Sequence, residues 1–275
     1  MREIKTPTLH TLEFDGLDDF AGSFAGQNDR SRQEIFANAY AEDGLQWFGN
    51  DTGADAVRKC REGDLAIAEK SDPLVSKFEA IALETTRRAW ADDVCGSIPN
   101  VPAFIAGHPL AMRRRIRQES AAAPLRIFVD LFISEGFTPE QIEKRGAAIM
   151  ALVRVLSSRR PVELWAGCAS ERSGRQIIAV RMDTAPMDLA RCGYALIHPS
   201  FTRRLLFACI RSITTDQNSI PPMRGGHAEC LAPIFGEGEL VAIGGMISDD
   251  QLALSDPEKW IAQKIEQLAP VDLAA

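Results

Sequence analysis

The densest cluster of charge in the chain is a basic run formed by Arg113, Arg114, Arg115 and Arg117. The planar guanidinium group donates paired hydrogen bonds to phosphates and carboxylates. The run is therefore a candidate contact for nucleic acid or for a protein partner. No aromatic residue lies within it, which disfavours stacking of single-stranded bases. A further interpretation places the run on a helix that forms internal salt bridges with Glu119.

Other residue types that perform catalysis lack the spacing that their chemistry needs. His227, Glu229 and Cys230 resemble half of a zinc-deaminase signature, but no cysteine follows to complete the metal site. The six cysteines include no Cys-x-x-Cys pair. The sequence has neither the Gly-x-Ser-x-Gly turn of serine hydrolases nor a Walker A loop. No catalytic constellation is indicated, and whether the protein is an enzyme stays open, with a non-enzymatic role favoured.

The elements that would position such residues become regular after about residue 123. Residues 125–133 form an almost continuous apolar stretch interrupted by Asp130, which predicts a buried central strand. The segment 138–141 (TPEQ) supplies a cap, a first-turn proline and a capping-box partner, so a long helix should begin there. Residues 161–166 are typical of the next strand.

The link after this second strand determines the predicted topology. Residues 168–175 are too few for a crossover helix, so the strands at 161–166 and 176–182 should be antiparallel neighbours. The long helix between the first two strands predicts a right-handed parallel crossover. The strand at 176–182 should then lie at the edge of a mostly parallel sheet, with 125–133 central. Later helices, a fourth strand and a last helix are predicted at 184–196, 199–211, 239–247 and 255–268.

The part before residue 123 is predicted to be mainly helical. Helical patterns occur at residues 34–41, 54–70 and 75–90. Residues 96–109 hold three prolines and two glycines and indicate a connector. We therefore expect a helical N-terminal extension at 1–122 and an α/β domain at 123–275.

The order of elements in the second part resembles a von Willebrand factor A-like domain, a doubly wound sheet with one short antiparallel edge strand. In that family an Asp-x-Ser-x-Ser motif, a later threonine and an aspartate after the fourth strand hold a divalent cation. Here the segment 130–134 (DLFIS) keeps the aspartate and the last serine but has Phe132 in the middle. The resemblance implies Mg²⁺ on Asp130, Ser134, Thr184 and Asp249, with Thr202 and Asp250 as alternatives for the last two. Without a metal, Asp130 would be a buried acid satisfied by backbone amides.

The segments 107–115, 123–134 and 145–165 resemble an uncharacterised family of bacteriophage and prophage proteins. This resemblance implies a phage origin and no known activity. We therefore expect a non-enzymatic interaction or assembly protein whose partner is a phage or host protein. One alternative is a nucleic-acid or transcription accessory factor that uses the basic run. Another is a divalent-metal enzyme around Asp130.

Composition limits the class of protein further. The chain has 275 residues, of which 45% are apolar, and a net charge of -7. These values indicate a globular protein rather than a disordered or fibrous one. Six scattered cysteines are too few for a disulfide scaffold. No secretory signal or long apolar run is apparent, so we expect a cytoplasmic protein, in the host cytoplasm if a phage encodes it, without contact to a membrane.

Overall fold

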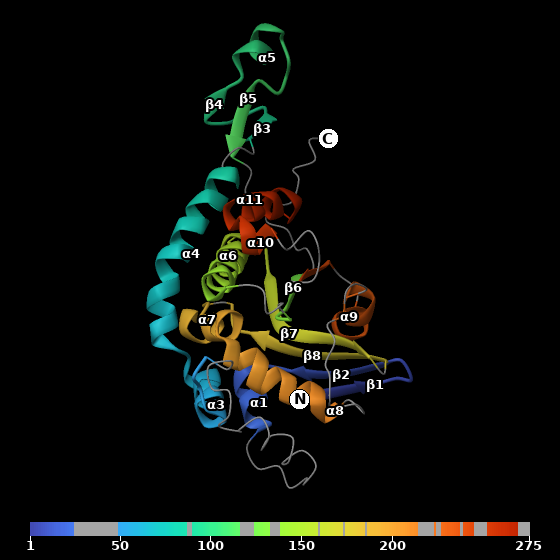
Figure 1. The fold of residues 1–275 in the computed structure, drawn as a ribbon. Coiled ribbons are helices and arrows are strands. Elements are labelled where there is room, and N and C mark those ends of the chain that lie inside the picture. The colour runs from blue at the N-terminus through green and yellow to red at the C-terminus, as the bar shows by residue number, and fades with distance from the viewer. Residues whose placement is uncertain are drawn as a thin grey trace.

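The computed structural model describes residues 1–24, 49–86, 90–115, 124–132, 138–158, 160–172, 174–184, 186–213, 223, 227–236, 239–244 and 252–268. The body of the protein is built on a six-stranded sheet with helices on both faces (Figure 1). Its strands are β1 (Arg2–Lys5), β2 (Leu9–Phe14), β6 (Leu125–Asp130), β7 (Val162–Arg172), β8 (Gly174–Met182) and β9 (Leu240–Gly244). They lie in the order β1-β2-β8-β7-β6-β9.

Parallel pairs predominate in this sheet. β6 pairs in parallel with β7 on one side and β9 on the other. β2 also pairs in parallel with β8, whereas β7–β8 and β1–β2 are antiparallel. The predictions of an α/β fold, a mostly parallel sheet, an antiparallel pair after the second strand and an internal first strand are thus confirmed.

Two details of the predicted sheet were wrong. β8 is not an edge strand, because β2 pairs along it over Leu9–Phe14. β7 continues to Arg172, so the link predicted at 168–175 is mostly strand. The hairpin turns at Gly174, whose φ of 96° suits a residue without a Cβ. β1 and β2 come from the part expected to be mainly helical, and the domain boundary at 122 and 123 stays a prediction.

Two hydrophobic cores follow from the alternation of side chains along β6. Ile127 and Val129 face the larger core, and Phe128 faces a smaller one under α9 (His227–Phe235). The helices of the larger core are α1 (Leu17–Gly22), α3 (Gly53–Glu62), α4 (Leu65–Thr86), α6 (Pro139–Ser157), α7 (Leu189–Ile197), the π-helical η2 (Phe201–Leu206), α8 (Phe207–Ile213), α10 (Leu252–Ser255) and α11 (Pro257–Leu268). No helix among the described residues is long and apolar enough to cross a membrane.

The best predicted helix is α6. The Thr138 side chain accepts the backbone N–H of Gln141, and the Gln141 side chain accepts that of Thr138, which forms the expected capping box. The helices predicted at 54–70 and 75–90 have other bounds, since α3 ends at Glu62 and α4 already begins at Leu65. The break between α3 and α4 falls at Gly63, with φ of 83°, while Pro73 lies inside α4. The helix predicted at 34–41 lies outside the described residues.

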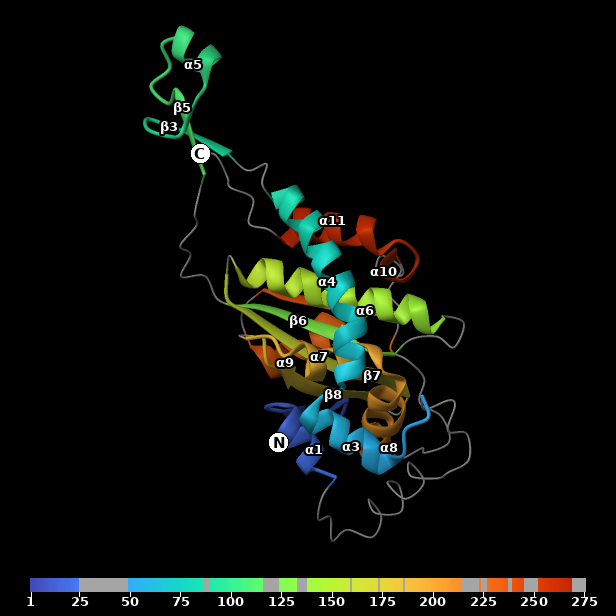
Figure 2. The same ribbon diagram turned by 90° about the vertical axis from the view of Figure 1, so that its left-hand side faces the viewer.

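A small second sheet forms an arm that stands away from the body beyond the end of α4 (Figures 1 and 2). We call residues 90–115 the arm. It contains β3 (Trp90–Asp93), β4 (Ile98–Pro99), α5 (Val101–Ile105) and β5 (Met112–Arg115). The strand order is β3-β5-β4, and both pairs are antiparallel. Its strands contact one another, but none of its elements packs extensively on a described element of the body.

Candidate functional site

A pocket opens at the C-terminal end of β6, and ligands commonly bind at the carboxyl ends of parallel strands in α/β sheets. Its volume is about 40 Å³, room for a few water molecules. The end of β6, the first turn of α6, the end of α7 and the start of η2 contribute its walls. The lining includes apolar Leu131, Ile142 and Phe207 and polar His198, Thr202 and Arg203.

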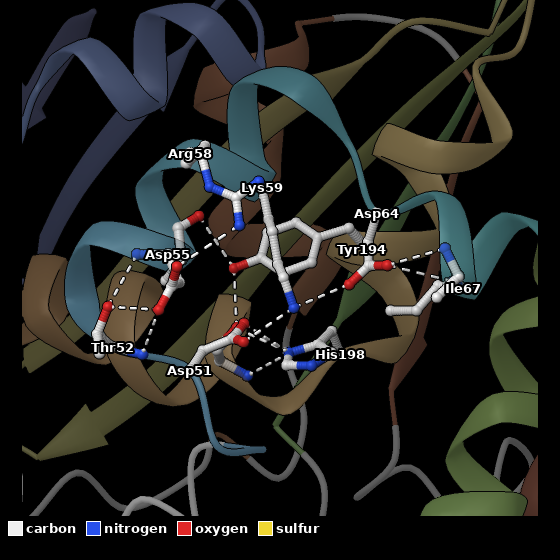
Figure 3. A network of polar contacts seen from close by, with 12 residues as sticks. Asp51, Thr52, Asp55, Arg58, Lys59, Asp64, Ile67, Tyr194 and His198 are labelled. Carbon is white, nitrogen blue, oxygen red and sulfur yellow. Dashed lines mark hydrogen bonds and ion pairs between the residues drawn. The ribbon is translucent and has the colours of Figure 1, made fainter.

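A buried polar network lies behind His198 (Figure 3). Asp51, which precedes α3, receives Lys59 Nζ at 2.8 Å on Oδ1 and Ser200 Oγ at 2.8 Å on Oδ2. Lys59 also pairs with Asp64 at 2.9 Å. Both Asp51 and Ser200 are buried, and so the network ties the start of α3 to the segment between α7 and η2.

Ser200 Oγ has three short polar contacts. It lies 2.8 Å from Asp51 Oδ2, 2.7 Å from His198 Nδ1 and 2.9 Å from the Tyr194 hydroxyl. Its one proton is donated to the Asp51 carboxylate. The Tyr194 hydroxyl donates to the Ala56 carbonyl at 3.0 Å, and His198 Nδ1 accepts the backbone N–H of Ser200 at 3.2 Å.

Burial dominates the titration of this network. Burial lowers the pKa of His198, and the positive charge of Lys59 lowers it further. The carboxylate of Asp51 acts in the opposite direction but does not outweigh burial. Burial also lowers the pKa of Lys59, but hydrogen bonds to Asp51 and Asp64 outweigh it and raise that pKa overall. The pKa of Tyr194 is raised by burial. At neutral pH we therefore infer a neutral imidazole near a charged Lys59.

The arrangement limits the chemistry of the site. Ser200 is fully buried, so its hydroxyl has no access to a substrate and cannot act as a nucleophile. His198 lines the pocket, and its Nδ1 is held on the other side by Ser200. The network fixes the orientation of the imidazole.

Asp130, the first predicted metal ligand, is buried at the end of β6 beside this pocket. Its Oδ1 accepts the backbone N–H of Phe132 at 2.9 Å. Arg145 Nη2 donates to the Asp130 carbonyl at 3.1 Å, which brings a buried guanidinium next to this residue. A positive charge here disfavours a second cation at the same place.

The structure does not bring Thr184 to Asp130. Thr184 Oγ1 donates to the Val162 carbonyl at 3.1 Å, at the start of β7. Asp130 lies opposite Gly167, five residues further along the same strand, a separation of roughly 16 Å. The alternative Thr202 lies in the pocket lining, with Leu131. Ser134, Asp249 and Asp250 lie outside the described residues.

Of the four predicted ligands the structure describes Asp130 and Thr184, and it does not bring these two together. Among the described residues, no group of three or more His, Cys, Asp or Glu side chains is placed to hold a metal ion. In the deaminase-like segment, the side chains of His227 and Glu229 are not described. Cys230 is buried and accepts a hydrogen bond from Arg175 Nη1 at 3.3 Å.

The basic run lies on β5 and not on the helix that we expected. Arg113 is exposed and pairs through Nε with Asp92 at 3.1 Å. This hydrogen bond, together with one from Asn100, lowers the pKa of Asp92. Arg114 and Arg115 continue the strand opposite β3, and their side chains are not described. Arg117 and Glu119 lie outside the described residues.

The arm also carries most of the exposed apolar side chains. Of eight large hydrophobic residues that are exposed among the described ones, six lie in it. They are Val94, Ile98, Val101, Phe104, Ile105 and Leu110. The most exposed are Phe104 at 72% and Ile105 at 80%. No side chain between Asp92 and Arg113 is buried, so the described side chains of this small sheet form no core.

Sequence reasoning missed both the His198 network and the apolar arm. Asp51 lies in a turn-rich segment, GNDTG, which predicted only a cap, and Thr52 does cap α3. Asp51 and Ser200 are 149 residues apart in the chain, so no local pattern connects them. The arm did leave a signal, since residues 94–112 contain no Asp, Glu, Lys or Arg.

The family described as "Domain of unknown function (DUF7192)" matches residues 3–228. The matched range begins in β1, includes the arm and the residues of the His198 network, and ends at the start of α9. No curated protein and no solved structure matches the chain. Because the match spans most of its length, the chain belongs to the DUF7192 family of domains of unknown function.

Proposed function

We propose that this protein is a non-enzymatic interaction or assembly protein and that the arm contacts its partner. The observation that carries the proposal is the concentration of exposed apolar side chains between Val94 and Leu110. Contiguous apolar patches of several hundred Å² are uncommon on monomeric proteins and mark interaction surfaces. The absence of charged residues at 94–112 supports the same role, because charge is depleted at the centre of interfaces.

The way the arm is built gives independent support. Small units below about 40 residues rarely fold without disulfides, metals or association. The arm has 26 residues by its bounds at 90–115, and Cys95 is a free thiol. Its described side chains form no buried core. A partner that covers these side chains would supply the missing burial.

The proposal extends to fold family and origin. The order β8-β7-β6-β9, with its antiparallel β7–β8 pair, supports a von Willebrand A-like arrangement for this part of the sheet. The sequence resemblance supports a phage origin and a phage or host protein as partner. The pocket at His198 does not argue for catalysis, since the hydroxyl beside it is buried.

The test compares the native mass of the protein in extracts of its source cells with that of two variants. We expect wild type in an assembly, and the double variant Phe104→Ser, Ile105→Ser at the mass of the free 30.1 kDa chain. Leu65→Ser is the control, because Leu65 is equally exposed, at 73%, but lies on α4. Wild type at the mass of the free chain would contradict the proposal. So would release by nuclease, which would indicate the nucleic-acid alternative.

A further inference from the structure

We infer that the partner of the arm is a second copy of this chain, bound arm to arm across a two-fold axis. The inference rests on the proposed function and specifies it. It starts from the amount of surface available. The six exposed apolar residues of the arm offer on the order of 600 Å², close to the roughly 800 Å² that each partner buries in a standard interface. One arm covering another would therefore be sufficient for a stable contact.

The described body offers no other surface that matches the arm. The other large hydrophobic residues that are exposed on the described body are Met1, which precedes β1, and Leu65, the first residue of α4. These two residues do not form a patch. An apolar surface of this size needs an apolar surface opposite it. On the described chain only the arm itself provides one, which favours a self-complementary contact of the two-fold type.

Charge and shape are compatible with that contact. The uncharged stretch at 94–112 is flanked by Asp92 and Arg113, whose side chains are 44% and 49% exposed. These two side chains pair with each other at 3.1 Å within one arm, so the charges beside the apolar stretch are already balanced and do not oppose the approach of a second arm. The arm also stands clear of the body in both views, so two arms can meet without a clash between bodies (Figures 1 and 2).

The first experiment is sedimentation equilibrium of the purified full chain, up to about 100 μM, above the dissociation constants usual for standard-size interfaces. We expect wild type and Leu65→Ser at twice the 30.1 kDa chain mass. Phe104→Ser, Ile105→Ser should weaken dimerisation at least about 30-fold, because buried anchor residues dominate interface energies. A monomeric wild type, or a dimer that the double variant leaves intact, would overturn the inference.

The second experiment locates the interface without a substitution. Cys95 lies on the arm and is the exposed one among six free cysteines, so a thiol-reactive spin label reports from the arm alone. Arm-to-arm contact should produce dipolar coupling between the two labels, and a dimer without coupling would refute it. If purified wild type is monomeric but the same chain lies in an assembly in cell extract, the partner is not a second copy of this chain. The proposed function would then still hold.

Discussion

Replacing Asp51 by alanine should destabilise the protein by about 3 kcal/mol. The carboxylate is buried and accepts hydrogen bonds from Lys59 and Ser200, both at 2.8 Å. Breaking a buried ion pair from one side costs roughly 3–5 kcal/mol, and a hydrogen bond to a charged group contributes about 1.5–3 kcal/mol. Lys59 keeps Asp64 at 2.9 Å and is partly exposed, which places the expected loss at the lower end.

Urea and thermal unfolding measure this loss directly. For a chain of this size, about 3 kcal/mol corresponds to a fall in Tm of roughly 6–10 °C. Asp18→Ala is the matched control, because Asp18 also forms an ion pair of 2.8 Å, with Arg191, but its side chain is 72% exposed. Exposed pairs contribute about 0–1 kcal/mol. If Asp51→Ala is no less stable than Asp18→Ala, the buried network does not hold α3 to the segment before η2.

Three further predictions concern the body. Acidification from about pH 7.5 to about pH 5.5 should destabilise wild type more than His198→Gln. Burial lowers the pKa of the folded imidazole, so the unfolded chain binds the proton first as the pH falls. Equal pH dependence of Tm for the two proteins in calorimetry would refute this. Gly167→Ala should cost more than about 4 kcal/mol, since its Cβ would lie 1.8 Å from the Ile178 carbonyl oxygen, and normal expression with an unchanged Tm would contradict the register. Mg²⁺ and a chelator should give the same Tm, because Arg145 lies against Asp130; a rise with Mg²⁺ that Asp130→Asn abolishes would show a cation site.

Local signals predicted the parts of the fold that local interactions determine. The capping box of α6 and the antiparallel pairing of β7 with β8 each depend on a few neighbouring residues, and both predictions were confirmed. β2 has no comparable signal. Its sequence, LHTLEF, pairs with β8 in parallel, so Leu9 lies opposite Arg175 and the partner is far along the chain. Parallel pairing of distant segments leaves no turn to recognise.

The same reasoning explains the misassigned basic run. Arginine has a good helix propensity, and four arginines near each other favour a helical interpretation. Arg113, Arg114 and Arg115 nevertheless lie in a strand, because β5 pairs with β3 on one side and β4 on the other. Pairing partners decide strand formation more than intrinsic preference does. The partners themselves, β3 and β4, are too short to be recognised from sequence.

The separation of arm and body has a thermodynamic consequence that tests both at once. The arm's elements do not pack extensively on the described body, so its association should leave the unfolding of the body unaffected. A ligand that binds only the native state raises Tm with concentration when its site unfolds together with the rest. Here the site is the arm, which has no buried side chain in common with the cores at β6 and α6. The Tm of the body should therefore be independent of protein concentration in wild type. The double variant Phe104→Ser, Ile105→Ser should have the same Tm as wild type. Asp51→Ala should lower Tm and leave the dimer mass unchanged. A body Tm that rises with concentration in wild type alone would mean that arm and body unfold as one unit.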